Sequence, residues 1–394
     1  MNKKKLWLWC LYDFANSFVQ GNFLLYFSRW MVVEGGLSDL YFNLIFVFAA
    51  IFMLFVAPRL AAKTDKHGGL IRHLTSSTMG IVFFMSLAAL FPLFGWNVYL
   101  GALCYLVGFL CYQLSFVFFN PLLNDIADEK HRGRASGYTQ AANAIGMVFG
   151  LIAFAPFAKT NIGALLPSIM GFLLLAMPIM IFYKEPEKVG RPVEDSEKID
   201  FKKFRKLFAV PGVAAALLSF FFFNDALVTM ANNLSIYTKQ IFDATEKMTI
   251  VMVVGIQVMS AVGAIIGGFI GDKVGLRKVL IISLIAWIIL LPIFALANDF
   301  KAAVIAASAL GLFFGAIWNT SRAYASTVIP KKDLAYGFSF FTIFERLSSI
   351  MGPLTWGLIV AITGSYRMAL GALSIFVLCG LFSMFINREN KKIA

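Results

Sequence analysis

Acidic and amide side chains stand inside apolar stretches of this chain, where each of them needs a partner. Asp13, Asn16 and Gln20 follow one another at intervals of three and four residues, so they share one face of a helix. A carboxylate and two carboxamides on one face can hydrogen-bond a polar solute, or they can hold neighbouring helices together. For Asp13 the structural alternative is an ion pair with an Arg near the cytoplasmic helix ends.

A second group of ionisable residues lies deep in later apolar stretches. Asp225 has no basic residue near it in the sequence at its depth, so it is the strongest candidate for taking up and releasing a proton. Glu345 and Arg346 are adjacent and point about 100° apart, so they cannot pair with each other. We expect Arg322 to be the partner of Glu345. The other candidates for binding a solute or an ion are Gln113, Asn120, Asn143, Asn224, Gln257, Trp318 and Asn319.

The composition places these residues in a membrane protein. Of the 394 residues, 60% are hydrophobic and 14% are charged, whereas a soluble domain has about 45–50% apolar and about 25% charged residues. Such an excess excludes an ordinary soluble enzyme and a disordered chain, and it argues against an alternating β-barrel. We predict an all-α polytopic fold with twelve transmembrane helices. The predicted spans are 6–33, 39–62, 73–95, 98–123, 135–157, 162–183, 209–234, 247–271, 278–298, 301–328, 335–363 and 366–387.

The basic residues give the orientation. The loops on one side hold 26 Lys and Arg residues and those on the other hold six, so both termini are predicted to be cytoplasmic. The long polar segment 184–208 divides the chain into six-helix bundles at 1–183 and 209–394. Within it, 198–206 is a basic amphipathic stretch that we expect to contact anionic lipid. This distribution explains the net charge of +13 without a nucleic-acid partner.

The sequence lacks the residue patterns that a metal site or ATP hydrolysis would require. Cys10, Cys104, Cys111 and Cys379 lie in apolar stretches without metal-ligand spacing, and the three histidines are scattered. No Walker A motif occurs, so ATP hydrolysis within this chain is unsupported. We therefore expect no metal, no cofactor and no enzymatic activity, and we expect a monomer.

Two loops suggest an internal repeat. Asp65 follows the second span and Asp272 the eighth, each within a small-x-x-x-Asp-basic-x-Gly pattern. Solvated tight turns are the alternative. The pattern resembles the cytoplasmic loop signature of the major facilitator superfamily, whose six-helix halves are repeats. That resemblance implies a conformational latch at Asp65 and Asp272, with Arg277 beside the second copy.

Longer motifs resemble one group of that superfamily, the vacuole effluxers, which include the autophagy-related vacuolar amino-acid exporter and bacterial relatives. The matching motifs are Tyr12-Asp13-Phe14-Ala15-Asn16-Ser17, Phe119-Asn120-Pro121, Phe223-Asn224-Asp225, Trp318-Asn319-Thr320-Ser321-Arg322 and Gly352-Pro353. The resemblance implies export of a small solute, such as an amino acid, by alternating access. It also implies a bacterial inner membrane and a coupling proton or other ion. Export of drugs or lysolipids remains the alternative.

Overall fold

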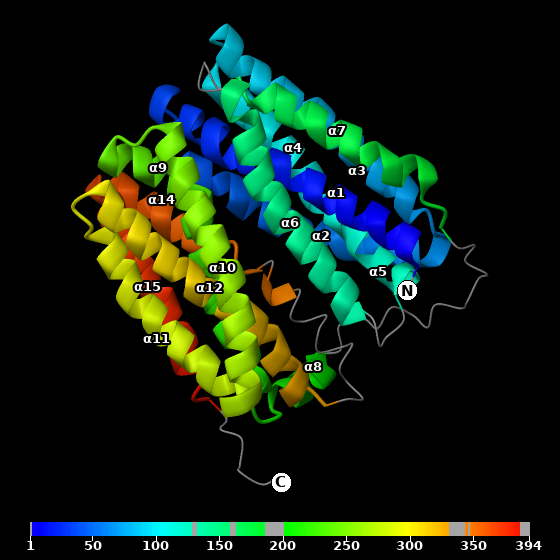
Figure 1. Cartoon of the computed structure of the whole chain (residues 1–394), viewed down its shortest axis with the longest axis vertical. Helices are drawn as coiled ribbons and strands as arrows, with labels where there is room; N and C mark the ends of the chain where they lie inside the picture. The colour runs from blue at the N-terminus through cyan, green and yellow to red at the C-terminus, as the bar shows by residue number, and fades with distance from the viewer. Residues whose placement is uncertain are drawn as a thin grey trace. The chain divides into compact units, whose positions relative to one another are not determined.

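The computed structural model describes residues 2–127, 132–157, 163–185, 201–330, 343–345 and 347–386. Over these ranges the chain is helical apart from short turns, and no strand occurs in them. Figure 1 shows the helices along the chain, from the blue N-terminal α1 to the red α15. The all-α prediction is confirmed.

Two compact units divide the chain. Unit 1 comprises Met1–Ser38 and Ile51–Ser196, and unit 2 comprises Asp39–Ala50 and Glu197–Ala394. The first residues of the second span therefore pack within unit 2, although they precede the rest of unit 1 in sequence. The predicted domain boundaries at 183 and 209 stay a prediction.

Unit 1 contains the first six spans. Its helices are α1 (Lys3–Asn22), the remainder of α2 (Asp39–His67), α3 (Leu70–Phe94), α4 (Val98–Phe119), α5 (Leu123–Ile126), α6 (Arg132–Phe154) and α7 (Leu165–Phe182). Two π-helical turns, Phe23–Phe27 and Trp30–Glu34, extend α1, and the 3-10 turn Asn120–Leu122 joins α4 to α5.

Unit 2 contains the later spans. Its helices are α8 (Phe201–Phe208), α9 (Val213–Phe242), α10 (Glu246–Val274), α11 (Leu276–Ala295), α12 (Phe300–Val328), α14 (Met351–Thr363) and α15 (Tyr366–Ser383). The basic stretch predicted to be amphipathic thus forms the short helix α8.

Polar caps begin several of these helices. Asn97, Thr245 and Asp299 each accept a backbone N–H from the first turn of the helix that follows, which satisfies a donor that has no partner inside the helix. Gly95 and Gly364 end α3 and α14 in the left-handed conformation, with φ of 65° and 66°. Local sequence therefore sets these helix ends close to the predicted ones.

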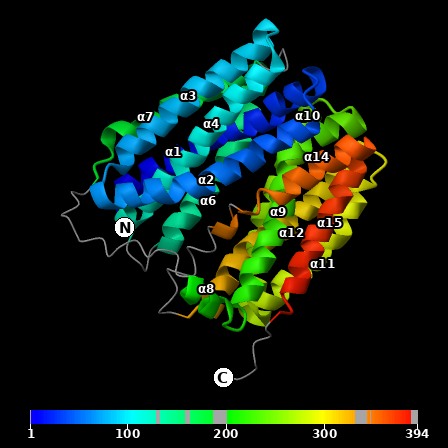
Figure 2. The same cartoon turned by 180° about the vertical axis from the view of Figure 1, so that it is seen from behind.

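Both units pack their helices in the same pattern. In unit 1, α1 packs against α6 and α7, and α3 packs against α4 and α7. In unit 2, α9 packs against α14 and α15, and α11 packs against α12 and α15. These pairs join the same positions within each set of six spans, as expected for a duplicated bundle. Figure 2 shows the two sets of helices from behind.

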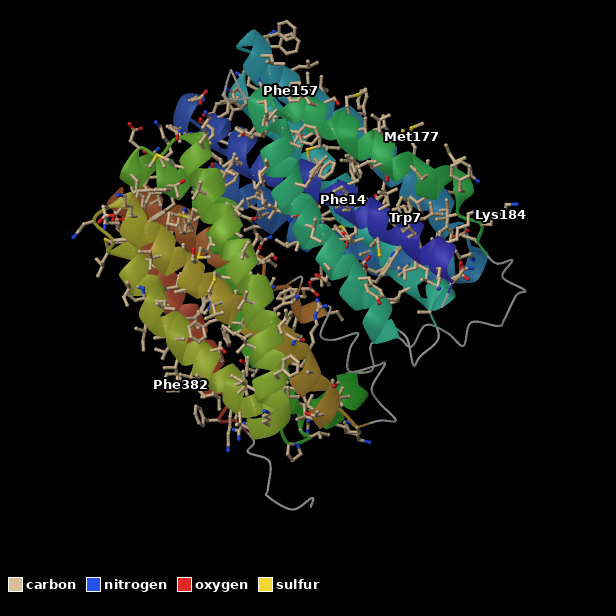
Figure 3. The ribbon with its side chains drawn as sticks, in the orientation of Figure 1. Trp7, Phe14, Phe157, Met177, Lys184 and Phe382 are labelled. Carbon is tan, nitrogen blue, oxygen red and sulfur yellow. The ribbon has the colours of Figure 1, made fainter. Side chains whose placement is uncertain are left out.

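Large apolar side chains cover the outer surface of the helices. Trp7, Phe157 and Phe382, which Figure 3 labels, are all more than half exposed. Ten helices in the described residues are long and apolar enough to cross a membrane, and Met351–Thr363 is a shorter apolar helix. Together with α1 and α14, they correspond to the twelve predicted spans.

The eleventh span differs from the prediction. It was expected to run unbroken over 335–363, but residues 348–350 form a turn and α14 begins only at Met351. Pro353 lies in the first turn of α14, where its missing N–H costs nothing because that group would have no partner inside the helix. The sequence Gly352-Pro353 therefore starts a helix here.

Candidate functional site

Asp13 is held by an amide of the neighbouring helix. Its side chain is 4% exposed, and Asn143 Nδ2 of α6 donates to Asp13 Oδ1 at 3.0 Å. The helices α1 and α6 approach closely at Gly146, where a Cβ would lie 2.2 Å from Phe14 O and 2.4 Å from Ser17 Oγ. Asp13 therefore pairs with a carboxamide, and no ion pair joins it to an Arg among the described residues.

The rest of the Asp13 face is polar and only partly satisfied. Tyr112 Oη of α4 donates to Gln20 Oε1 at 2.8 Å. Asn16, between Asp13 and Gln20, is fully buried, and neither of its amide atoms has a hydrogen-bond partner in the described part of the chain. A buried polar group left unpaired costs about 1–3 kcal/mol. Asn16 therefore has both a donor and an acceptor that no group in the described part of the chain satisfies.

Asp225 is held by backbone instead. It is fully buried in α9, and Gly352 N–H donates to its Oδ1 and Oδ2 at 2.9 and 2.8 Å. Gly352 is the second residue of α14, so the carboxylate lies at the N-terminus of that helix, whose partial positive charge favours an anion. A Cβ at Gly352 would lie 2.2 Å from Thr229 Oγ1, so the close approach requires glycine.

Asn224 extends the contact between α9 and the turn before α14. Its Nδ2 donates to Ser348 Oγ at 2.6 Å, and Ser348 Oγ donates to Glu345 O at 2.7 Å. Asn224 Oδ1 and Thr229 Oγ1 are buried without a hydrogen-bond partner among the described residues. Around Asp225 in unit 2, some buried oxygen atoms therefore take part in hydrogen bonds and others do not.

Arg322 does not pair with Glu345. Within the residues that the structure describes, no ion pair joins them, and the Arg322 guanidinium lies over the Trp318 ring, 4.8 Å from its centroid. Trp318 in turn lies against Phe220, with 6.0 Å between ring centroids. Arg322 and Trp318 are one helical turn apart on α12, so a local contact replaces the expected one across helices.

The remaining predicted site residues have mixed positions. Asn319 Nδ2 donates to Ala264 O at 3.0 Å and so fastens α12 to α10. Gln113 and Gln257 are half-buried and Asn120 is exposed. Arg277 Nη2 donates to Met384 O at 2.5 Å. Arg346 and the side chains of Asp65 and Asp272 lie outside the described residues, so the latch stays a prediction.

Sequence reasoning missed several partners. Tyr112, Ser348 and Thr229 were not among the candidates, because a hydroxyl on an apolar helix is common and carries no distinctive signal. A reciprocal amide pair also went unnoticed: Asn43 and Asn233 donate to each other at 3.0 and 2.9 Å within unit 2. Asn233 lies in the predicted span 209–234, but nothing in the sequence pointed to its partner.

In the described part of the chain, no group of three or more His, Cys, Asp or Glu side chains could hold a metal ion. The polar groups of both sites are carboxylates, carboxamides and hydroxyls. Such groups form hydrogen bonds with polar molecules, and a carboxylate can also take up a proton.

Comparisons with known proteins point to transporters. The family model described as "Vacuole effluxer Atg22 like" matches residues 144–394, and the one described as "Major Facilitator Superfamily" matches residues 2–151. A multi-drug resistance efflux pump PmrA homolog of Lactococcus lactis is 25% identical over 97% of this chain and 93% of its own. Autophagy-related protein 22 of Pichia angusta is 26% identical over 49% of this chain and 36% of its own.

One solved structure has the same fold over nearly the whole chain. The crystal structure of the nucleoside transporter NupG (D323A mutant) matches with a TM-score of 0.79, over 98% of this chain and 100% of that one. The sequence identity is 12%, so this likeness concerns the fold alone. It confirms the predicted twelve-helix fold.

Proposed function

We propose that this chain, which belongs to the vacuole effluxer Atg22-like family of the major facilitator superfamily, exports a small solute by alternating access. The substrate class is an amino acid or a similar small metabolite, and an ion gradient drives its export. The chain acts as a monomer in a bacterial inner membrane with both termini in the cytoplasm. The helix α8 lies on the anionic inner leaflet.

The observation that carries this proposal is the polar face of α1. Asp13 has a carboxylate that no Lys or Arg neutralises in the described residues, and Asn16 beside it has an amide with no partner. A carboxylate attracts an ammonium group, and a carboxamide can donate to a carboxylate while accepting from an amine. A free amino acid carries both of these partner groups, an ammonium and a carboxylate.

A second candidate is export of lipophilic cations or lysolipids. It is favoured by the relative named as a multi-drug resistance efflux pump homolog, which matches over 97% of this chain. The neighbouring rings of Trp318 and Phe220 would suit an apolar substrate. In that case the carboxylate of Asp13 would attract the cation of the drug.

The test is solute exchange by the purified chain in proteoliposomes with equal pH on both sides. We expect unlabelled internal amino acid to drive uptake of labelled external amino acid, and Asp13→Asn to lower the rate about tenfold, as expected from the loss of a charge-assisted bond. Ligand-induced thermal stabilisation across amino acids, lipophilic cations and lysolipids identifies the class. Exchange of cations alone would replace the amino-acid proposal with the second candidate.

A further inference from the structure

The start of α14 presents a backbone donor inside the protein. The first N–H groups of a helix have no acceptor within it, and Pro353 has no N–H to offer. Gly352 N–H is therefore the donor that needs an outside partner, and both oxygens of Asp225 accept from it, at 2.9 and 2.8 Å. One carboxylate thus links the middle of α9 to the first turn of α14.

This link depends on the charge of the carboxyl group. An ionised acceptor forms a hydrogen bond about twice as strong as a neutral one, and the N-terminus of a helix attracts an anion. When Asp225 binds a proton, one of its two oxygens becomes a donor and no longer accepts from Gly352 N–H. The contact between α9 and α14 is therefore weaker in the protonated form.

An alternative partner for the protonated form is already in place. Thr229 Oγ1 is fully buried and has no hydrogen-bond partner among the described residues. A Cβ added at residue 352 would lie 2.2 Å from Thr229 Oγ1 and 2.7 Å from Asp225 Oδ1. Both oxygens therefore face the Cα of Gly352, but no hydrogen bond joins them in this structure. A protonated Asp225 must turn its carboxyl group to donate to Thr229.

Charged groups on the neighbouring elements act elsewhere. The elements that contact α9 include α8, α10, α11, α12, α14 and α15, together with the first residues of α2. Towards the end of α9, Tyr366 donates to Asp39 and Arg367 donates to Ala295 O, which also accepts from Tyr237. Tyr237 is more than three turns beyond Asp225.

On the other side, Tyr324 Oη lies near Gly212 at the start of α9, and Arg322 lies over Trp318. Cys379 of α15 neighbours Gly380, which packs at Ser219. The helix α14 carries no ionisable residue. The backbone oxygen of Glu345 accepts a hydrogen bond from Ser348 Oγ. Arg205 and Lys206 lie on α8, before the start of α9. Asp225 forms no ion pair with any of these groups in the described structure.

We propose that Asp225 is the proton-binding residue of the transport cycle and that α14 responds to its charge. The deprotonated carboxylate ties α14 to α9. A proton taken from one aqueous side binds a carboxylate oxygen, weakens the bond to Gly352 N–H and frees the turn 348–350 to move. The proton leaves to the other side when both oxygens accept from Gly352 N–H again. This inference rests on the proposed function for its role in transport.

Hydrogen–deuterium exchange tests the link directly in the full-length protein in nanodiscs. Amide exchange of a peptide covering residues 347–357 is measured between pH 5.5 and 8.5 and corrected for the intrinsic effect of pH. We expect the corrected rate to be about tenfold higher in acid, because the charge-assisted bond is lost. In Asp225→Asn the corrected rate should not depend on pH.

Thr229 supplies a second variant with a matched control. Thr229→Val removes the acceptor of the protonated form, so the midpoint of the exchange profile should shift to lower pH. Thr229→Ser keeps the hydroxyl, and its midpoint should match that of the unchanged protein. A purely structural threonine would alter stability in the valine variant without moving the midpoint, and that outcome would count against the proposal.

The two proposals can fail separately. Corrected exchange rates that do not vary with pH in the unchanged protein, or that vary equally in Asp225→Asn, overturn the proton switch. Absence of any solute exchange at equal pH in proteoliposomes overturns the proposed function and leaves the hydrogen-exchange result standing. If the solute is exchanged but the hydrogen-exchange rate does not vary with pH, the proposed function stands and the proton switch is overturned.

Discussion

The Asp13 and Asp225 sites are built alike. In each, an acid lies on the first helix of its six-span set, a hydroxyl residue follows four positions later, and a glycine of the fifth helix packs against that turn. Ser17 Oγ lies 2.4 Å from the position of a Cβ at Gly146, and Thr229 Oγ1 lies 2.2 Å from the one at Gly352. The duplication therefore extends from the order of helices to individual atoms.

The donor that each acid receives is different. Asp13 accepts from the side chain of Asn143 on α6, which is a continuous helix through that region. Asp225 accepts from the backbone of Gly352, where the corresponding helix is interrupted. A side-chain amide can rotate to another partner, but a backbone N–H moves only with its helix. A change of charge at Asp13 is therefore local, whereas the same change at Asp225 acts on α14.

Filling the two glycine contacts should give the largest effects. Gly146→Ala places a Cβ 2.2 Å from a backbone oxygen of α1, and Gly352→Ala places one 2.2 Å from the Thr229 hydroxyl. We expect each to destabilise the protein by about 3 kcal/mol, with Gly146→Ala the more harmful because backbone cannot rotate away. Thermal unfolding in detergent measures both. Gly371→Ala is the control, since nothing lies within 4 Å of its added Cβ; a loss of stability there as large as at Gly352 would contradict the argument.

Neutralising the two acids without changing their shape should separate the sites. Asp225→Asn replaces a charge at a helix N-terminus and turns one acceptor into a donor beside Gly352 N–H, so we expect a loss of about 2 kcal/mol. Asp13→Asn keeps an oxygen acceptor for Asn143, so its loss should stay under about 1 kcal/mol. Chemical denaturation of both variants at neutral pH gives the comparison. Equal losses would mean that the backbone donor makes no difference.

The acids themselves were predictable from the sequence, but their partners were not. Asp13 and Asp225 stand out because a carboxyl group inside an apolar span is costly and needs a reason to be there. Most spans were predicted with edges close to the observed ones, since length and hydropathy determine them. The exceptions are α9, which runs on to Phe242, and the interrupted eleventh span. A backbone N–H such as that of Gly352 has no signature of its own, and Gly352-Pro353 was noted only as part of the family resemblance.

Pairing across helices was the weakest part of the sequence analysis. Depth along a span can be counted from the sequence, but the direction in which a side chain points from its helix depends on packing. Arg322 and Glu345 were matched by depth, and the structure places Arg322 over Trp318 on its own helix instead. Asn43 and Asn233 show the converse, because two amides 190 residues apart meet without any sequence signal.

Asn16 should show an opposite effect on stability and on transport. Both of its amide atoms are buried without partners in the described residues, so Asn16→Leu removes an unpaired polar group and should raise the free energy of unfolding by about 1 kcal/mol. The same variant should lower the rate of amino-acid exchange about tenfold, because the solute loses a hydrogen-bonding group. Unfolding and proteoliposome exchange are measured on one preparation. A variant that is more stable and equally active would remove Asn16 from the site.

The smallest expected difference concerns the hydroxyl partners of the two sites. Ser348→Ala leaves Asn224 fully buried with both amide atoms unpaired, because Asn224 Oδ1 already has no partner in the described structure. Tyr112→Phe leaves Gln20 without its donor, but Gln20 is only half-buried and can turn towards water. We expect losses of about 1.5 and about 0.5 kcal/mol respectively. Denaturation curves of the two variants, with the double variant as a check on additivity, measure a gap of this size. A larger loss for Tyr112→Phe would mean that the polar cluster of unit 1 is the one more shielded from water. The expected difference between the Asp13 and Asp225 sites would then be reversed.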